Sequence, residues 1–350
     1  MCNIAGYVGE RDAAPILLDM MSREAGFGGG YYTGLATMAD GELHWDKVLG
    51  DMDLLYEAIG GKAFPGHVGI IHSRSNSGGD REWAHPFISN DEKIAYVANG
   101  SYGEFAKTNA ERRDKVAMEL EQRGVRYSSK SDPVGHYPRL SDGSGVHMSE
   151  VMCHLIRTLI MDGFEPEDAM RRAFTAYPSE IVALAIDTDV PDAILAARYN
   201  QPMMLGRAED GVYLATTAMA FPEDVRFYAI DILPACCSAT VRRDGWTIHG
   251  FESAIPVTPL DANMYRGAQN AILRHINAAG EPVSVGKCCS LTKSYHKDGE
   301  IFQSAVLAYE CLRGLKDAGK IRVEKIRVPG APEGEGKIFS TAFSFVKAAD

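Results

Sequence analysis

Cys2 is the residue whose type and position best fit chemistry in this sequence. The initiator Met1 is removed efficiently only before small residues, and cysteine is small, so we expect Cys2 to become the first residue. It then carries both a thiol and a free α-amine. An α-amine has a pKa of about 7.7–8.0, so its unprotonated form can take the thiol proton directly or through one water. Cys2 is therefore predicted to be the nucleophile of an amide-cleaving enzyme.

The alternative for Cys2 is a buried structural cysteine, because free cysteines are among the most buried side chains. Its position favours catalysis. The segment from Asn3 to Val8 is rich in apolar residues and reads as a buried strand. A terminus that leads directly into such a strand is anchored inside the fold rather than frayed.

Several stretches of the sequence, in this order along the chain, resemble those of a known family. The chain begins MCNIAGYVG, residues 69–79 read GIIHSRSNSGG, and residues 85–105 read HPFISNDEKIAYVANGSYGEF. With SEVMCHLI at 149–156 and the strand-rich residues 196–221, they resemble the class II glutamine amidotransferases. These are N-terminal-nucleophile hydrolases found in glucosamine-6-phosphate synthase, glutamine phosphoribosylpyrophosphate amidotransferase, asparagine synthetase and glutamate synthase. The resemblance covers roughly residues 1–250 and implies a four-layer αββα sandwich with two antiparallel sheets packed face to face.

The resemblance also implies roles for single residues. Arg74 falls on the arginine that pairs with the α-carboxylate of glutamine, and a planar guanidinium suits a carboxylate better than lysine does. The side-chain amide of Asn99 and the backbone N–H of Gly100 fall on the oxyanion-hole donors. Without the resemblance, Arg74 would be a surface residue at a strand end and Asn-Gly a hairpin turn. Ser75 and Ser77, in the segment of Arg74, are candidate substrate-binding residues.

Four positions depart from the family pattern. Gly28 stands where an arginine beside the nucleophile is usual, Ser75 replaces a tryptophan, and Ala98 replaces a histidine. Met148 stands where the family has the aspartate that holds the α-amine of glutamine. Asp142, six residues earlier, is a candidate replacement; the alternative is that it is a solvated loop residue.

The elements that must position these residues follow an α+β pattern. Strand-like segments recur between 31 and 249, and amphipathic helices are expected at 51–59, 105–123, 149–161 and 165–176. Asp12 is expected to cap a helix with Pro15 in its first turn. Pro256 and Pro259 break the pattern and predict a boundary between a domain at 1–257 and a smaller one at 258–350.

The smaller domain is expected to contain helices near 263–279 and 302–318, a short strand at 282–285 and a strand pair at 322–328 and 337–345. This is the order of a winged helix. A small α/β appendage packed on the main domain is the alternative.

Composition limits the class of protein. The 350 residues are 45% hydrophobic and 24% charged, with no run of about 18 apolar residues and no basic leader. The seven cysteines include no C-x-x-C motif and no Cys/His spacing typical of a zinc site, and we expect no cofactor. Free thiols are stable in a reducing compartment, so we expect the protein to be cytoplasmic. Net charge is −11, and the acidic excess of residues 1–260 argues against nucleic-acid binding there. Residues 261–350 hold 13 Lys and Arg against 10 Asp and Glu, and this mildly basic stretch leaves the question open, although nucleic acid is not the partner that we expect.

The sequence therefore predicts a glutaminase-type amidotransferase in which Cys2 forms a thioester and ammonia leaves. Residues 258–350 are too few for a sugar isomerase, a phosphoribosyltransferase or an ATP-using synthetase, so we expect a separate synthase subunit to accept the ammonia. One alternative is an N-terminal-nucleophile hydrolase of a different amide, which Gly28, Ser75 and Met148 favour. The other is a non-catalytic protein that senses glutamine or binds a partner.

Overall fold

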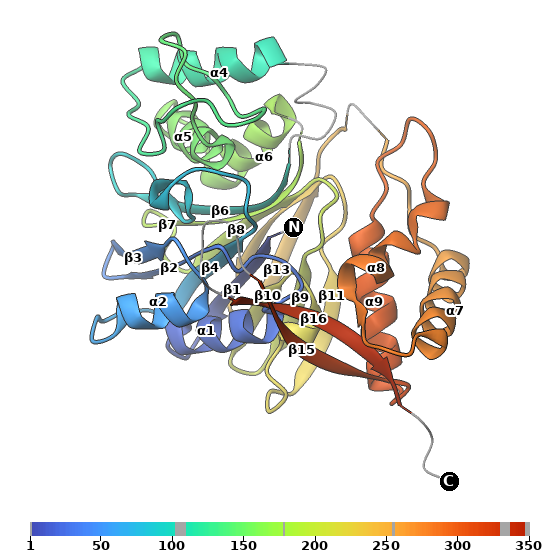
Figure 1. The fold of residues 1–350 in the computed structure, drawn as a ribbon. Helices are drawn as coiled ribbons and strands as arrows, with labels where there is room; N and C mark the ends of the chain where they lie inside the picture. Colours follow the sequence, from blue (N-terminus) through green and yellow to red (C-terminus); the bar gives the residue numbers. More distant parts are fainter. Residues whose placement is uncertain (1, 102–109, 178, 254–255, 330–336, 347–350) are drawn as a thin grey trace.

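The computed structural model describes residues 2–101, 110–177, 179–253, 256–329 and 337–346. Two antiparallel sheets pack face to face between layers of helices (Figure 1). The first sheet has the order β11-β9-β10-β1-β4-β2-β3. Its strands are β1 (Asn3–Gly9), β2 (Tyr32–Ala39), β3 (Glu42–Val48), β4 (Val68–Arg74), β9 (Met204–Ala208), β10 (Gly211–Ala215) and β11 (Phe227–Ile232).

The second sheet has the order β13-β12-β8-β7-β6-β5. Its strands are β5 (Phe87–Ile88), β6 (Ile94–Ser101), β7 (Glu180–Asp187), β8 (Ala193–Arg198), β12 (Cys237–Arg242) and β13 (Gly245–Gly250). Strand β6 shows how the alternation of side chains builds two layers at once. Ala95 and Val97 pack against the first sheet, whereas Ile94 and Tyr96 pack against helices. The period of two along a strand therefore gives each sheet two buried faces.

Helices cover the two outer faces and complete the four-layer sandwich that the family resemblance implied. The first sheet carries α1 (Ala13–Glu24) and α2 (Met52–Ile59), and the second carries α5 (Met148–Met161) and α6 (Pro166–Ala176), with α4 (Ala110–Gln122) on α5. Short 3-10 turns lie at Arg81–Trp83, Ala218–Ala220 and Lys293–Tyr295.

One predicted detail at the start of α1 differs. Asp12 holds the N-cap position but its side chain makes no capping hydrogen bond. The backbone N–H of Ala13 donates to the Gly66 carbonyl instead, at 2.9 Å, so another loop meets this end of the helix.

The C-terminal elements form a separate cluster beside the first sheet (Figure 1). They are α7 (Ala262–Ala278), β14 (Val283–Ser284), α8 (Val285–Ser290), α9 (Ser304–Asp317), β15 (Ile321–Pro329) and β16 (Lys337–Phe345). The strands pair in the order β14-β16-β15, which with this succession of helices is the arrangement of a winged helix. The sequence predicted the order of these elements except the short α8.

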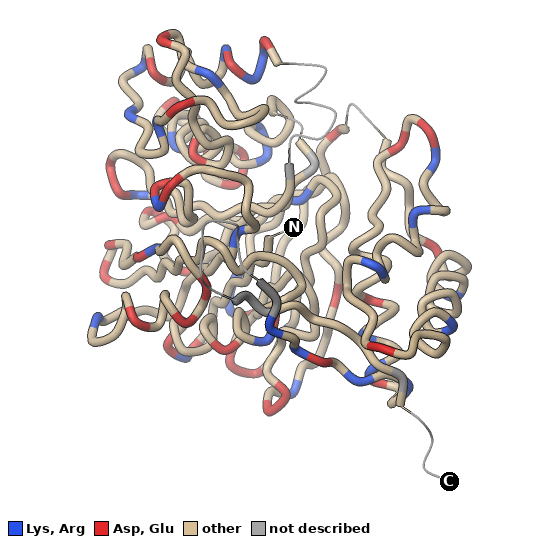
Figure 2. The backbone as a smooth tube through the Cα atoms, in the orientation of Figure 1, with Lys and Arg blue, Asp and Glu red and all other residues tan. Residues whose placement is uncertain are grey.

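Helix α9 holds the place of the helix that enters the major groove when such a motif binds DNA. Here the residues from 304 to 316 are buried or only partly exposed, and the two basic side chains among them, Arg313 and Lys316, pair with Glu310 and Glu223. Two of the basic side chains of β15 are paired with acids, Arg322 with Glu324 and Arg327 with Asp51 and Asp53, so β15 does not form an unbroken basic face (Figure 2). Both observations argue against DNA recognition through α9.

Candidate active site

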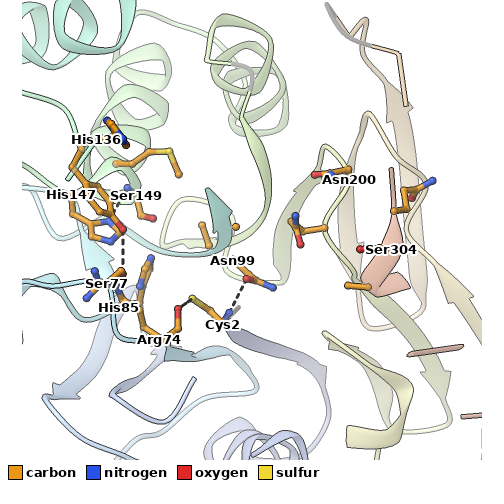
Figure 3. A pocket seen from close by; sticks show the side chains of 18 of the residues that line it. Cys2, Arg74, Ser77, His85, Asn99, His136, His147, Ser149, Asn200 and Ser304 are labelled. Atoms are coloured by element: carbon orange, nitrogen blue, oxygen red, sulfur yellow. Dashed lines mark hydrogen bonds between the residues drawn. The ribbon is translucent and has the colours of Figure 1, made fainter. Parts of the chain in front are cut away.

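A cavity of about 680 Å³ lies where the start of β1 meets the ends of β4 and β6 (Figure 3). Six of the seven residues that the sequence singled out line it: Cys2, Arg74, Ser75, Ser77, Asn99 and Gly100. The seventh, Asp142, does not. Its carboxylate accepts from Lys130 at 2.8 Å and from Ser144, in an exposed loop. The structure therefore agrees with the solvated-loop alternative for Asp142.

Cys2 is held on both sides. Its backbone nitrogen donates to Oδ1 of Asn99 at 3.0 Å, and its Sγ lies 3.7 Å from Oγ of Ser75. The next residue, Asn3, is buried and donates through Nδ2 to the carbonyls of Glu24 and Gly28. These contacts fix the start of β1, so the thiol stays at the cavity. Removal of Met1 would convert the same nitrogen into the α-amine.

The orientation of Asn99 follows from its contact with Cys2. Because Oδ1 accepts from the Cys2 nitrogen, Nδ2 faces the other way, and this buried donor has no partner in the described structure. The next residue, Gly100, has a φ of 127°, in a region that side chains disfavour. A buried donor without a protein partner, in the cavity that Cys2 also lines, is suited to receive an oxygen that gains negative charge.

Arg74 ends β4 and is only 1% exposed. Its guanidinium lies 4.4 Å from the centre of the Tyr32 ring, and Nη1 donates to the Gly78 carbonyl at 2.9 Å. Nη2 has no partner within the described residues. A buried guanidinium nitrogen without a partner indicates an anionic ligand that reaches the same place.

Three buried imidazoles surround Arg74, and the sequence reasoning assigned none of them to the site. The rings of His72 and His85 lie 3.8 Å apart, and His147 lies 5.2 Å from His85. Burial holds the pKa of His72 at about 3. It also lowers the pKa values of His85 and His147 well below their usual range, and the charges of neighbouring histidines, Arg74 and Lys47 lower them further. All three rings are therefore neutral near pH 7.

These neutral histidines make stability depend on pH. In the unfolded chain each would take up a proton below a pKa of about 6.5, while the folded rings stay neutral. The unfolded state then binds more protons, so we expect the free energy of unfolding to fall by about 1.4 kcal/mol per pH unit for each ring below about pH 6.5.

Urea unfolding measures how the free energy of unfolding changes with pH. The pH should run from about 7.5 to about 5, which spans the histidine pKa of about 6.5 in the unfolded chain. His147 caps α5 by accepting from the Ser149 N–H at 3.0 Å, so His147→Asn keeps a capping side chain and removes one titrating ring. Its slope should be shallower than that of the unsubstituted protein. Equal slopes would contradict a neutral His147.

The C-terminal elements supply the far wall of the cavity through residues 302–305. Gln303 joins this wall to the first part of the chain. Its Oε1 accepts from Arg198, and its Nε2 donates to the Thr258 carbonyl at 3.1 Å. Arg198 also donates to the Asn200 carbonyl, and Asn200 lines the same cavity.

The loop around Phe27, which Asn3 contacts through the Gly28 carbonyl, also packs against the C-terminal elements. Phe27 packs edge-on against Tyr309 and Phe343, with ring centres 5.2 and 6.2 Å away. The backbone N–H of Thr341 donates to the Gly26 carbonyl at 3.0 Å. The cavity is thus built from both ends of the chain.

Among the residues that the structure describes, no group of histidine, cysteine or acidic side chains has the arrangement that a metal ion needs. Over the same part of the chain, no helix combines the length and the apolar character that a membrane crossing needs.

Comparison with known proteins places this chain near one group of enzymes. It is 26% identical over 333 residues to glutamine–fructose-6-phosphate aminotransferase (isomerizing) of Streptomyces coelicolor, covering 94% of this chain and 47% of that protein. It is 28% identical over 249 residues to the same enzyme of Symbiobacterium thermophilum, covering 70% of this chain and 34% of that protein. The chain thus spans about half, or less, of the length of these relatives. No family model matches it.

Among solved structures, glutamine phosphoribosylpyrophosphate amidotransferase from B. subtilis has a TM-score of 0.59 and 16% identity, covering 96% of this chain and 71% of that one. An allosteric regulatory enzyme of purine biosynthesis follows with a TM-score of 0.58 and 16% identity, covering 100% of this chain and 68% of that one. At this identity the likeness concerns the fold.

Proposed function

We propose that this chain is a glutaminase-type amidohydrolase, a proposal that starts from its confirmed resemblance to the class II glutamine amidotransferases. Its substrate is the terminal carboxamide of glutamine or of a close analogue of glutamine. The observation that carries the proposal is the contact between Cys2 and Asn99. That one contact holds the nitrogen that would become the general base, and it leaves Nδ2 of Asn99, which lines the same cavity as Cys2, without a partner among the described residues.

The reaction follows from this geometry. The α-amine of Cys2 takes the thiol proton, and Sγ attacks the carboxamide carbon. Nδ2 of Asn99 and the N–H of Gly100 stabilise the oxyanion of the tetrahedral intermediate. The C–N bond then breaks, the protonated α-amine returns its proton to the leaving nitrogen, and ammonia departs. Water attacks the thioester, which releases a carboxylic acid and restores the thiol.

Arg74 orients the substrate by pairing with its carboxylate. The unpartnered Nη2 supports this role, because two parallel N–H donors on one guanidinium fit the two oxygens of a carboxylate. Ser75, whose Oγ lies near Sγ, and Ser77, whose Oγ lies 3.4 Å from the hydroxyl of Tyr137, provide further hydroxyl groups along the cavity.

We further propose that residues 1–257 form the hydrolase domain and that 258–350 form a second domain that closes its cavity. The side chains of residues 302–305 in the cavity wall support this division. In this proposal the ammonia goes to a synthase that lies outside residues 1–350, since the elements from α7 to β16 form a small cluster around a core that also contains Phe27.

Ammonia release and intact-mass analysis test the function together. Mass analysis first establishes that Met1 has been removed. Incubation with glutamine and with analogues that keep its carboxamide and carboxylate should then release ammonia and give a transient mass increase equal to the acyl group. Protein with a free Cys2 that neither releases ammonia nor gains mass with any of these amides would contradict the proposal.

A further inference from the structure

The polar atoms without a partner in this cavity are mainly hydrogen-bond donors. Nδ2 of Asn99 and Nη2 of Arg74 are donors by chemistry. Nδ1 of His147 accepts from the Ser149 N–H, so in the neutral ring Nε2 carries the proton and is a third unpartnered donor. The neutral ring of His85 adds one donor and one acceptor, and Oδ1 of Asn200 adds an acceptor.

No carboxylate accompanies these donors. Among the residues that the structure describes, none of those lining the cavity is an aspartate or glutamate. Acids near the lining residues along the chain have other partners: Glu150 accepts from the backbone and hydroxyl groups of Ser128 and Ser129, Glu300 accepts from the hydroxyl of Thr258, and Asp142 pairs with Lys130. The charged groups near His85 and His147 are the cations Arg74 and Lys47, which help to lower the pKa values of both rings.

Met148 adds an apolar surface to the same wall. It lines the cavity, is 4% exposed and packs in the core between the second sheet and α5. It also holds the position at which the resemblance led us to expect the acid that binds an α-ammonium. The cavity thus presents a thioether where a cation would need a negative charge.

A free amino acid brings both a carboxylate and an ammonium group. The carboxylate gains the buried guanidinium of Arg74. The ammonium group loses its water, and the acceptors that it meets among the described lining residues are uncharged: one nitrogen of His85, Oδ1 of Asn200, and hydroxyl and amide oxygens, which do not compensate a buried charge. Glutamine would therefore bind with one of its two charges unpaired.

We propose, on the basis of the amidohydrolase function above, that this site prefers carboxamides that carry a carboxylate but no free ammonium group. Glutaramate, which is glutamine without its amino group, and N-acylated glutamines have this chemistry. Arg74 holds the carboxylate, Cys2 attacks the carboxamide, and the substituent at the α-carbon lies against Met148. The volume of about 680 Å³ leaves room for an acyl group there.

Steady-state hydrolysis of glutamine, glutaramate and N-acetylglutamine tests the preference. We expect kcat/KM to be higher by about tenfold or more for glutaramate, N-acetylglutamine or both than for glutamine, because an unpaired buried polar group costs affinity of that order. Faster hydrolysis of glutaramate alone would indicate a substrate that lacks the amino group. Faster hydrolysis of N-acetylglutamine alone would indicate a substrate whose amino group is acylated. Equal or better use of glutamine would overturn the inference, whereas no release of ammonia from any of the three would contradict the amidohydrolase function itself.

Substitutions at Met148 give a second, independent readout. In Met148→Asp, kcat/KM for glutamine divided by kcat/KM for glutaramate should rise by about tenfold or more, because the new carboxylate pairs with the ammonium group of glutamine. Met148→Asn adds polarity without charge, Met148→Leu keeps an apolar wall, and both are expected to keep the original order of substrates. A ratio unchanged in a folded Met148→Asp variant would count against the inference, and should that variant not fold, the three-substrate comparison decides alone.

Discussion

Cys2→Ala is expected to abolish ammonia release and acyl-enzyme formation while leaving the fold intact. The side chain is only half-buried, and the polar contact that Sγ makes with the described residues is the 3.7 Å approach to Oγ of Ser75, so little is lost on truncation. Alanine also permits removal of Met1, so the α-amine remains. Loss of a nucleophile that acts with its base as a unit lowers kcat by at least about 10⁴-fold. Ammonia assays and intact-mass analysis measure both effects.

Cys237→Ala is the matched control, because Cys237 is also half-buried and does not line the cavity. It should keep the original rate and the acyl-enzyme. If Cys2→Ala keeps the biological activity of the chain while ammonia release is lost, the non-catalytic alternative gains support. If it keeps ammonia release as well, Cys2 is not the nucleophile.

Asn99→Asp is expected to lower kcat by about 10²- to 10³-fold with a smaller effect on KM. The substitution keeps an oxygen that can accept from the Cys2 nitrogen, so the start of β1 stays in place. It removes Nδ2, the donor that the oxyanion would meet, and places a negative charge near the developing one. Because the oxyanion exists only in the transition state and intermediate, the loss should appear in kcat.

An Asn→Asp substitution at an exposed position is the control, because it adds the same negative charge outside the cavity. Asn90 lies in the turn between β5 and β6 and makes hydrogen bonds only with the backbone of Arg126. Asn90→Asp should leave kcat and KM unchanged. A reduction in kcat that is equal for the two variants, or an Asn99→Asp protein as active as the original, would contradict the oxyanion role.

Several parts of the fold could be predicted because local pattern and burial agree there. The strand after Cys2, the helix at α5 and the strands β6 and β7 alternate or repeat their apolar residues in the way that their buried faces require. Strands β3 and β11 were missed. Both lie at an edge of the first sheet, and Tyr228 and Ile230 of β11 are exposed, so a partly solvated edge gave no clear alternation. Helix α8, with six residues, is shorter than the window in which helical periodicity is visible.

The site was predictable only where its residues lie in one recognisable segment. Arg74 and Ser75 come with the end of β4, and Asn99 with the end of β6. His147 was missed, since a single histidine before a helix has no pattern of its own, and its contact with His85 depends on the packing of α5 on the second sheet. The wall at residues 302–305 lies about 200 positions beyond Asn99, and only the docking of α9 brings it to the thiol.

The anchoring of Phe27 between Tyr309 and Phe343 sets a constraint on when the chain can become active during its synthesis. Thr341 donates a hydrogen bond to the Ala25 carbonyl across 316 positions, so this contact forms only after Thr341 has left the ribosome. Contacts of such long range also close late, because the entropy of a large loop must be overcome first. Until then, a nascent chain carries its thiol without the loop support and far wall that complete the cavity.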